Sequence, residues 1–130
     1  MSKHDIVILD ASALLALINQ EKGAQEVKKY FPNVVMSAVN VAEVAAVLHF
    51  SGIPEAEVVE ILNDLVQTVI PFEKKHIYKT AFLRHHTKHL GLSFADRACL
   101  ALGILSKQPV VTADKAWAKL SLDLEVELIR

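Results

Sequence analysis

The chain has 130 residues, 52% of them hydrophobic, and its 14 Lys and Arg against 15 Asp and Glu give a formal charge of −1. This composition excludes an intrinsically disordered chain and a histone-like basic protein. The single cysteine, Cys99, excludes an internal disulfide, and the longest uncharged run, residues 30–42, is too short for a membrane-spanning helix of about 20 residues. Residues 1–5 lead into a strand-like segment with no signal peptide. We therefore expect one soluble cytoplasmic domain over residues 1–130, with no membrane contact.

Strand-like and helix-like segments alternate along the chain. Short β-branched apolar runs predict strands at residues 6–9, 34–36, 68–70, 110–112 and 125–129. Periodic, mostly apolar segments predict helices at residues 11–18, 23–31, 37–50, 54–66, 73–90 and 93–105. This alternation is typical of an α/β fold with a mainly parallel sheet.

Four carboxylates stand in apolar surroundings, whereas the other acids lie among polar residues. The four are Asp10, Glu43, Asp96 and Asp114. Asp10 and Asp114 each follow a predicted strand, and the other two lie near the starts of predicted helices. Taken singly, each acid fits a helix cap, because Ser93 to Asp96 has the form of a capping box and Asn40 to Glu43 a looser one.

As a set, the four acids predict a metal site. In an open parallel sheet, ligands bind outside the carboxyl ends of the strands, where these acids are expected to lie. Four carboxylates in one pocket repel one another and take up protons unless a cation is present. An all-oxygen site suits Mg²⁺ or Mn²⁺, as one or two ions. Such ions support hydrolysis of a phosphodiester bond.

Three polar side chains accompany the acids. Ser12 and Thr112 lie two residues from Asp10 and Asp114, and Asn40 precedes Glu43 by three. Each either orients a carboxylate, a phosphate or a metal ligand, or caps a local turn. The sequence leaves both roles open.

A basic segment lies between residues 73 and 89, where five Lys and Arg accompany one acid, a local charge of +4 that leaves −5 on the rest of the chain. Such a segment fits either an RNA-binding surface or a solvated helix face. On a helical wheel Lys75, Lys79 and His86 fall together beside an apolar stripe. The stripe consists of Ile77, Tyr78, Ala81 and Phe82. We take the three basic residues as candidate RNA contacts.

Four segments resemble a known family, the PIN-domain ribonucleases, and most of all its VapC-type toxins. They are DASALLALI (10–18), SAVNVAEV (37–44), GLSFADRACLALG (91–103) and VVTADKAW (110–117). The resemblance implies an α/β/α sandwich with a mainly parallel central sheet and Mg²⁺- or Mn²⁺-dependent endonucleolytic cleavage of RNA. It also implies a homodimer that is inhibited by a cognate antitoxin.

The family's acidic metal-binding and catalytic set falls on the four carboxylates already singled out, Asp10, Glu43, Asp96 and Asp114. Ser12, Asn40 and Thr112 match polar positions that accompany those acids. Some relatives carry a further acid shortly after the last one, where this chain has Ala116 and Trp117. That departure leaves the second metal position open.

Two other functions compete with a ribonuclease toxin. One is a catalytically inactive PIN-like module that binds RNA or a protein, which the intact acid set disfavours. The other is a receiver-type phosphotransfer domain, but residues 10–12 lack the second aspartate that such a domain needs. For the antitoxin, residues 11–18 and 54–66 offer apolar helices that a partner segment could contact.

Overall fold

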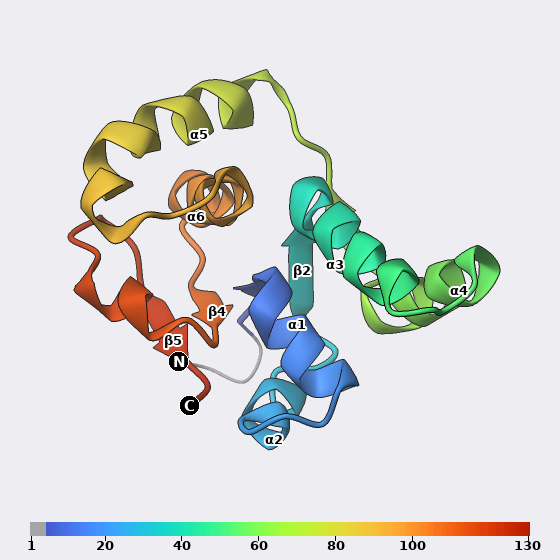
Figure 1. Ribbon diagram of the computed structural model, residues 1–130. Coiled ribbons are helices and arrows are strands. Elements are labelled where there is room, and N and C mark those ends of the chain that lie inside the picture. The colour runs from blue at the N-terminus through green and yellow to red at the C-terminus, as the bar shows by residue number, and fades with distance from the viewer. Residues whose placement is uncertain (1–4) are drawn as a thin grey trace.

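A sheet of five parallel strands forms the centre of the computed structural model, which describes residues 5–130 (Figure 1). The strands are β1 (Val7–Leu9), β2 (Val34–Ser37), β3 (Thr68–Ile70), β4 (Val110–Thr112) and β5 (Val126–Leu128). Their order across the sheet is β3-β2-β1-β4-β5, and every neighbouring pair is parallel. The predicted α/β fold with a mainly parallel sheet is confirmed.

Helices cover both faces of this sheet. They are α1 (Ala11–Ile18), α2 (Ala24–Lys28), α3 (Ala38–Phe50), α4 (Glu55–Leu65), α5 (Lys74–Thr87) and α6 (Phe94–Ser106), with 3₁₀ turns η1 (Lys88–Leu90) and η2 (Lys115–Lys119). Val7 and Leu9 of β1 pack in one core with α1 to α4, whereas Ile8 packs in a second core with α5 and α6. Successive strand residues point to opposite faces, so a three-residue strand serves both cores. The result is an α/β/α sandwich.

The register of the sheet places the candidate site. Leu9 pairs with Val111, so Asp10 and Thr112 lie at the carboxyl edge of two adjacent strands. Helix α1 starts directly after β1 at this edge, and α3 starts directly after Ser37, the last residue of β2. Residues that are far apart in the sequence therefore meet where the parallel strands end.

Two helices differ from the sequence-based expectation in length. The helix predicted over residues 23–31 is only α2, because Gly23 has a left-handed φ of 98° and the chain turns after Lys28. The helix predicted over residues 73–90 ends as an α-helix at Thr87 and continues as η1. None of the helices that the structure describes combines the length and apolar character needed to cross a bilayer.

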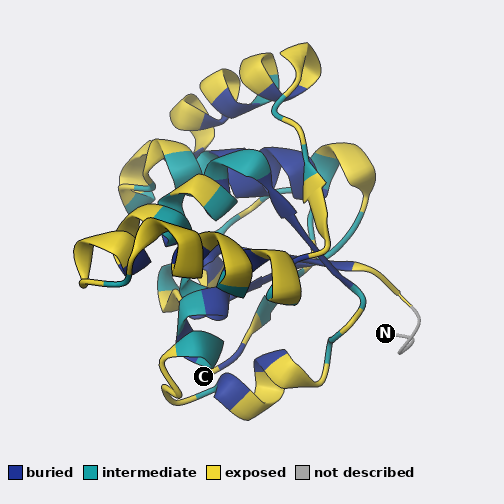
Figure 2. Ribbon diagram, turned by 90° about the vertical axis from the view of Figure 1, so that its right-hand side faces the viewer, coloured by how far each residue is buried: buried dark blue, intermediate teal, exposed yellow. Residues whose placement is uncertain are grey.

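Helix α5 exposes its apolar stripe. The apolar stripe at Ile77, Tyr78 and Phe82 faces solvent, with exposed fractions of 48%, 52% and 67%. The buried face of the helix consists instead of His76, Thr80, Leu83 and Thr87. The outer side of α5, the uppermost helix in Figure 2, is exposed along its length while its underside is buried.

Candidate active site

The Asp10 carboxyl lies at the end of β1, only 3% exposed, among three hydrogen-bond donors. The Ala13 backbone N–H donates to Asp10 Oδ1 over 2.8 Å, so Asp10 caps α1. The Ser12 hydroxyl lies 2.8 and 2.9 Å from the two carboxylate oxygens. The Thr112 hydroxyl donates to Oδ2 over 2.5 Å. Three donors fit an ionised carboxylate, which only accepts hydrogen bonds.

Burial opposes that ionisation. It raises the pKa of Asp10 from 3.8 to about 6, because a carboxylate removed from water loses hydration of its charged form. The hydrogen bonds from Thr112, Ala13 and Ser12 counteract the rise in pKa, and the Asp96 carboxylate adds to it. At neutral pH the Asp10 carboxyl is therefore mostly charged. Its buried charge lowers the stability of the folded protein, and a nearby cation would offset this effect.

Ser12 and Thr112 connect β1 to β4 through their side chains. Ser12 Oγ accepts from the Ala113 N–H over 2.9 Å, and Thr112 Oγ1 accepts from the Asp114 N–H over 3.0 Å. The two hydroxyl oxygens lie 3.3 Å apart. Each hydroxyl directs its hydrogen to Asp10 and its oxygen to the backbone after β4. Ser12 and Thr112 therefore orient the Asp10 carboxylate and also cap the turn after β4. The sequence left these two roles open, and both hydroxyls have both.

Asp96 lies half-buried in the first turn of α6, where it forms the expected capping box. The Ser93 N–H donates to Asp96 Oδ2 over 3.0 Å, and the Asp96 N–H donates to Ser93 Oγ over 3.1 Å. The N-terminus of a helix favours negative charge. The box therefore holds the Asp96 carboxyl group in a fixed place at the start of α6.

The looser capping box expected at Asn40 and Glu43 is wrong. Helix α3 is capped by Ser37, whose Oγ accepts from the Val39 N–H over 3.2 Å. The chain therefore enters the helix three residues before Asn40, and Glu43 falls in the second turn. Both side chains are thereby free for other contacts.

Asn40 uses that freedom to join α3 to α6. Its side chain is 1% exposed, and Nδ2 donates to the Ala95 carbonyl over 3.0 Å. Its Oδ1 is buried without a hydrogen-bond partner among residues 5–130. Burial raises the pKa of the neighbouring Glu43; a hydrogen bond from Asn40 lowers it, and the Asp96 carboxylate raises it again.

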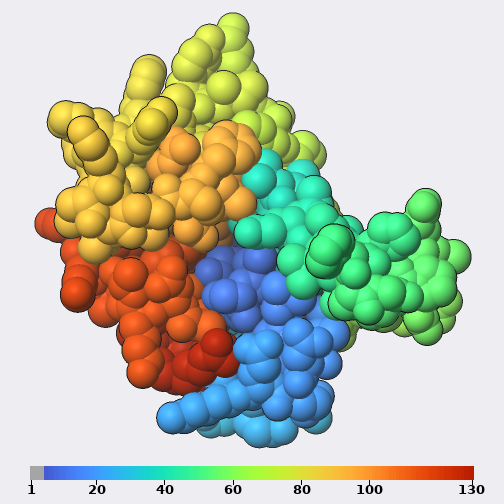
Figure 3. All heavy atoms as spheres, viewed as in Figure 1, coloured from blue at the N-terminus to red at the C-terminus, as the bar shows by residue number. Residues whose placement is uncertain are grey.

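Three of the four acids act electrostatically on one buried thiol. Cys99 lies on α6 one turn after Asp96 and is fully buried. Burial raises the pKa of Cys99, and the carboxylates of Asp10, Asp96 and Glu43 raise it further. All three acids therefore lie within electrostatic range of the same point. In the space-filling view the segments that carry them, blue α1, teal α3 and orange α6, border one another (Figure 3).

Asp114 lies two residues after the end of β4. It is exposed and caps η2, accepting from the Ala116 N–H over 3.0 Å. Thr112 links it to Asp10, since one hydroxyl contacts the carboxylate of Asp10 and the backbone of Asp114. Within residues 5–130, no three His, Cys, Asp or Glu side chains are close enough to hold a metal ion as they stand.

Comparison with known families identifies the fold. The family model of the PIN domain matches residues 7–122, which include all four acids. The chain belongs to the PIN domain family. A search of curated proteins finds no match to the chain.

Solved structures of similar fold include chains of several VapBC proteins. This PIN domain superposes on a chain of DNA-bound VapBC from Salmonella typhimurium with a TM-score of 0.74 and 11% identity, covering 97% of this chain and 99% of that one. For VapBC-1 from nontypeable Haemophilus influenzae the TM-score is 0.71 at 20% identity, covering 95% and 98%. For VapBC-5 from Mycobacterium tuberculosis it is 0.65 at 21% identity, also covering 95% and 98%. At these identities the likeness concerns the fold.

The oxygen atoms at this edge of the PIN domain fit a hard divalent cation. Carboxylates and amide carbonyls are the ligands that Mg²⁺ and Mn²⁺ prefer. Asn40 Oδ1 is buried without a partner among the described residues, and the pKa values of Asp10 and Glu43 are both raised in part by Asp96. A cation between these groups would relieve their repulsion.

The three candidate RNA contacts lie on α5 but not in one pocket. Lys75 borders a cavity near the start of the helix, and His86 borders a separate depression near its end. Lys79 is half-buried. Sequence reasoning missed Arg97, whose Nη1 donates to the Thr80 carbonyl over 2.9 Å and joins α6 to α5. In the sequence, only the position of Arg97 next to Asp96 pointed to it.

Proposed function

We propose that this PIN domain is a metal-dependent endoribonuclease that hydrolyses RNA phosphodiester bonds and acts as the toxin of a toxin–antitoxin pair. The observation that carries the proposal is that Asp10, at the carboxyl edge of the sheet, and Glu43 are both within electrostatic range of Asp96, and that all three act on the buried thiol of Cys99. Ionised carboxylates in partly buried positions lower the stability of the fold unless a cation binds near them. Membership of the PIN domain family supports nucleolytic chemistry for them.

Asp10, Glu43, Asp96 and Asp114 would hold Mg²⁺ or Mn²⁺, as one or two ions. A bound ion of this kind lowers the pKa of water and offsets negative charge that develops on a phosphate. Trp117, one of the two residues in place of a further acid, is only 1% exposed in the core beneath α6. A second ion would therefore depend on Asp114.

The residues would divide the remaining tasks by their surroundings. Asp10 is held by three donors and serves as a fixed anionic ligand. Glu43 is half-buried with a raised pKa, so it is suited to take a proton from the attacking water. Ser12 and Thr112 orient Asp10, and Asn40 holds the start of α6.

An antitoxin is the proposed protein partner, because the similar structures include members of toxin–antitoxin systems. Helix α4 offers a surface for it, because Val59 is 57% exposed and acids lie near it on the helix. These exposed acids are Glu55, Glu57, Glu60 and Asp64. A basic, partly apolar segment would suit this surface, and a basic side chain reaching Asp10 and Asp96 would neutralise the site.

We also propose that the protein forms a homodimer in the cytoplasm and that residues 1–130 constitute one PIN domain. The free, buried Cys99 fits a reducing compartment. Sedimentation of the purified protein tests the dimer. Co-purification with a small protein encoded next to it tests the antitoxin.

Cleavage of a labelled RNA pool tests the function itself. We expect the purified protein, free of antitoxin, to give discrete fragments with Mn²⁺ or Mg²⁺ and none with a chelator. Asp96→Asn should abolish cleavage while leaving the fold intact, since Asn can still accept the Ser93 N–H bond. Asp123→Asn is the matched control, because Asp123 is an exposed acid outside the proposed metal-binding set. Full activity of Asp96→Asn would overturn the assignment.

A PIN domain that binds RNA without cutting it is the second candidate. It is favoured by the fact that, within the described residues, no three potential ligands are close enough to hold an ion as they stand. A folded protein that binds the RNA pool but neither binds Mn²⁺ nor cleaves would select this function.

A further inference from the structure

Two aromatic rings project from the outer side of α5. Tyr78 and Phe82 lie one turn apart, with ring centroids 6.2 Å from each other and an angle of 25° between the ring planes. Their exposed fractions are 52% and 67%, so at least one side of each ring is open to solvent. Rings stacked along a helix and open to solvent offer faces on which other flat groups can stack.

Positive charge surrounds these rings. Helix α5 and η1 together carry five Lys and Arg and no acid. Among residues 5–130, no carboxylate lies within ion-pair distance of any of the five. Lys75 precedes Tyr78 by three residues, and Lys79 and His86 lie three before and four after Phe82, so each falls beside a ring on the helix surface.

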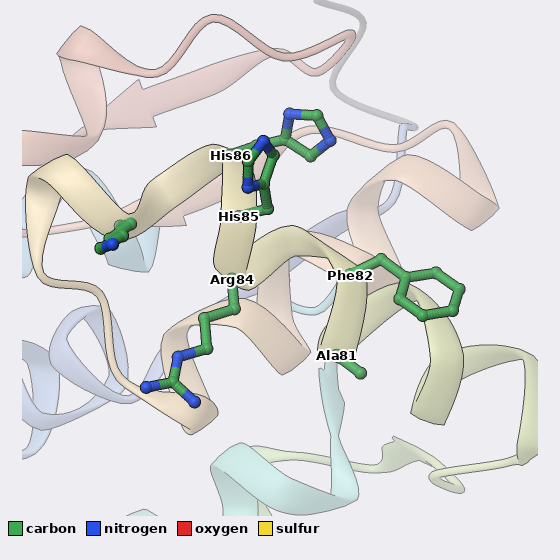
Figure 4. A pocket seen from close by; sticks show the side chains of 6 residues that line it. Ala81, Phe82, Arg84, His85 and His86 are labelled. Atoms are coloured by element: carbon green, nitrogen blue, oxygen red, sulfur yellow. The ribbon is translucent and has the colours of Figure 1, made fainter.

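A depression beside Phe82 extends this surface toward the end of the helix. Its lining consists of Ala81, Phe82, Arg84, His85, His86 and Lys88, with no acid. Figure 4 shows the imidazoles of His85 and His86 next to each other, with centroids 5.4 Å apart, and Phe82 projecting outward beyond them. Aromatic faces and unpaired cations therefore occupy one continuous side of α5.

The helix that carries this surface is fixed in place. His76, Thr80, Leu83 and Thr87 bury its underside, and the Glu73 capping box holds its first turn. Arg97 of α6 donates to the Thr80 carbonyl over 2.9 Å. The rings are thus displayed on a rigid support, so little order has to be created when a ligand binds.

We propose that Tyr78 and Phe82 form a base-stacking platform that binds single-stranded RNA, with the cations of α5 and η1 contacting its phosphates. The proposal rests on the proposed function, because the strand held here would be the substrate. Aromatic stacking next to positive charge is the general way in which proteins hold single strands without reading their sequence. Bases in a duplex are already stacked on each other and are not available to these rings.

The charge of the surface favours RNA over a second copy of the chain. In a two-fold contact through this face, five unpaired cations of one α5 would meet the same five of the other, with no acid between them. A polyanion instead gains from every one of these charges.

Helix α5 contacts the helix that carries Asp96. Arg97 of α6 donates to the Thr80 carbonyl, and the preceding residue, Asp96, acts electrostatically on Asp10 and Glu43. Thr80 lies on the buried underside of α5, whereas Tyr78 and Phe82 lie on its exposed outer side. The platform and the candidate site therefore belong to neighbouring helices.

Binding of a labelled single-stranded oligoribonucleotide of about 12 nucleotides, measured by fluorescence anisotropy with chelator present, tests the proposal without cleavage. The Tyr78→Ala/Phe82→Ala variant should lose at least about tenfold in affinity for each ring removed. Tyr78→Leu/Phe82→Leu, which keeps apolar bulk but removes the ring faces, should lose nearly as much. Tyr78→Phe/Phe82→Tyr should bind as the wild type does. Phe50→Ala, which removes a 95% exposed ring from α3, is the matched control.

The salt dependence separates stacking from charge. Lys75→Ala should reduce the slope of log affinity against log salt by about 0.7, whereas the ring variants should leave the slope unchanged. A duplex of the same sequence should bind to the ring variants with the same affinity as to the wild type. Melting curves followed by circular dichroism verify that each variant is folded.

Several results would overturn the platform. They are unchanged RNA affinity in the double Ala variant, full affinity in the double Leu variant, no RNA binding by the wild type at low salt, or a dimer that dissociates when the rings are removed. The last result would assign the face to a second copy. If the ring variants cleave RNA with unchanged KM, the platform is refuted and the nuclease proposal stands. If RNA binding depends on the rings but no RNA is cleaved, the platform stands and the nuclease proposal is refuted.

Discussion

The Thr112 hydroxyl donates to the Asp10 carboxylate over 2.5 Å although 102 residues separate them in the sequence. The contact exists because β1 and β4 are neighbours in the sheet and end together at its carboxyl edge. It connects the most buried acid of the site to the strand that leads to Asp114. The orientation of Asp10 therefore depends on the pairing of the two strands.

Removing the Thr112 hydroxyl should disturb Asp10 without changing the packing volume. We expect Thr112→Val to lower the free energy of unfolding by about 1–2 kcal/mol, because one oxygen of a buried carboxylate loses a donor. Thr112→Ser retains the hydroxyl and should keep most of the stability. Urea unfolding of the three proteins measures the difference. Equal stability of the Val and Ser variants would show that the hydrogen bond contributes nothing.

Asp10→Asn should stabilise the protein when no metal is present. The pKa of Asp10 in the folded protein is about 6, above its ordinary 3.8, so the folded state binds the proton more tightly than the unfolded state does. The charged group consequently costs stability above pH 6, by up to about 3 kcal/mol, and the cost disappears as the pH falls below 4.

The measurement is the melting temperature of wild type and Asp10→Asn at pH 5 and pH 8 in chelator. We expect the variant to melt higher at pH 8 and the difference to shrink at pH 5. Mn²⁺ should raise the melting temperature of the wild type only. A variant that is less stable at both pH values would contradict the burial cost.

His76 should make the start of α5 sensitive to acid. Its Nδ1 accepts from the Glu73 N–H over 2.9 Å, and its side chain is 3% exposed. Burial lowers the pKa of His76 below the ordinary 6.5; Lys75 lowers it further, and Glu73 opposes the shift. The unfolded state therefore takes up the proton first, so the contribution of His76 to stability is complete above about pH 6.5 and is lost as the pH falls below it.

Replacing His76 with Asn keeps an acceptor that does not titrate in this range. We expect the free energy of unfolding of His76→Asn to depend less on pH between 6.5 and 5 than that of the wild type. Denaturant unfolding across this range provides the comparison. Parallel pH dependences in the two proteins would argue against the proposed role of His76.

Glu43→Gln should separate proton transfer from ligand binding. If Glu43 takes a proton from water, its amide analogue should lower kcat by about 100-fold or more and change KM little. Steady-state kinetics on a defined RNA fragment, with Asp123→Asn as control, resolve the two constants. A rise in KM with unchanged kcat would assign Glu43 to substrate binding instead.

The sheet could be predicted from the sequence because its central strands β1, β2 and β4 are short, buried, mostly apolar runs. Ile8 and its neighbours Val7 and Leu9 serve opposite cores, and such continuous runs are typical of parallel strands. The four acids are conspicuous in the sequence because they stand in apolar surroundings, and their role in metal binding stays a prediction. The α2 boundary and η2 could not, because five-residue elements leave too little periodicity to detect.

The orientation of α5 could not be predicted from the sequence. Its apolar stripe is exposed and polar residues fill the buried side, where His76 and Thr87 form hydrogen bonds, although Thr80 Oγ1 has no partner among residues 5–130. Thr87 donates to the Leu83 carbonyl over 2.8 Å, and His76 accepts from the Glu73 backbone. Such bonds make burial of a polar side chain inexpensive, and they depend on geometry that the sequence does not display.

The hydrogen bonds within the candidate site could not be predicted from the sequence either. Spacing along the chain placed Ser12 near Asp10, but the bond from Thr112 requires the order of the strands. The exposure of Asp114 after β4 could not be predicted either. The four acids remain the predicted site, and the structure adds which side chains orient them.

Cleavage of RNA in water labelled with heavy oxygen tests the central proposal most directly. If the acid group activates water on a phosphodiester, a single turnover with Mn²⁺ places one labelled oxygen in the terminal phosphate of the product. We expect this label in the wild type, and no product from Asp96→Asn or in chelator. An unlabelled 2′,3′-cyclic phosphate, or cleavage that persists without metal, would contradict the proposal.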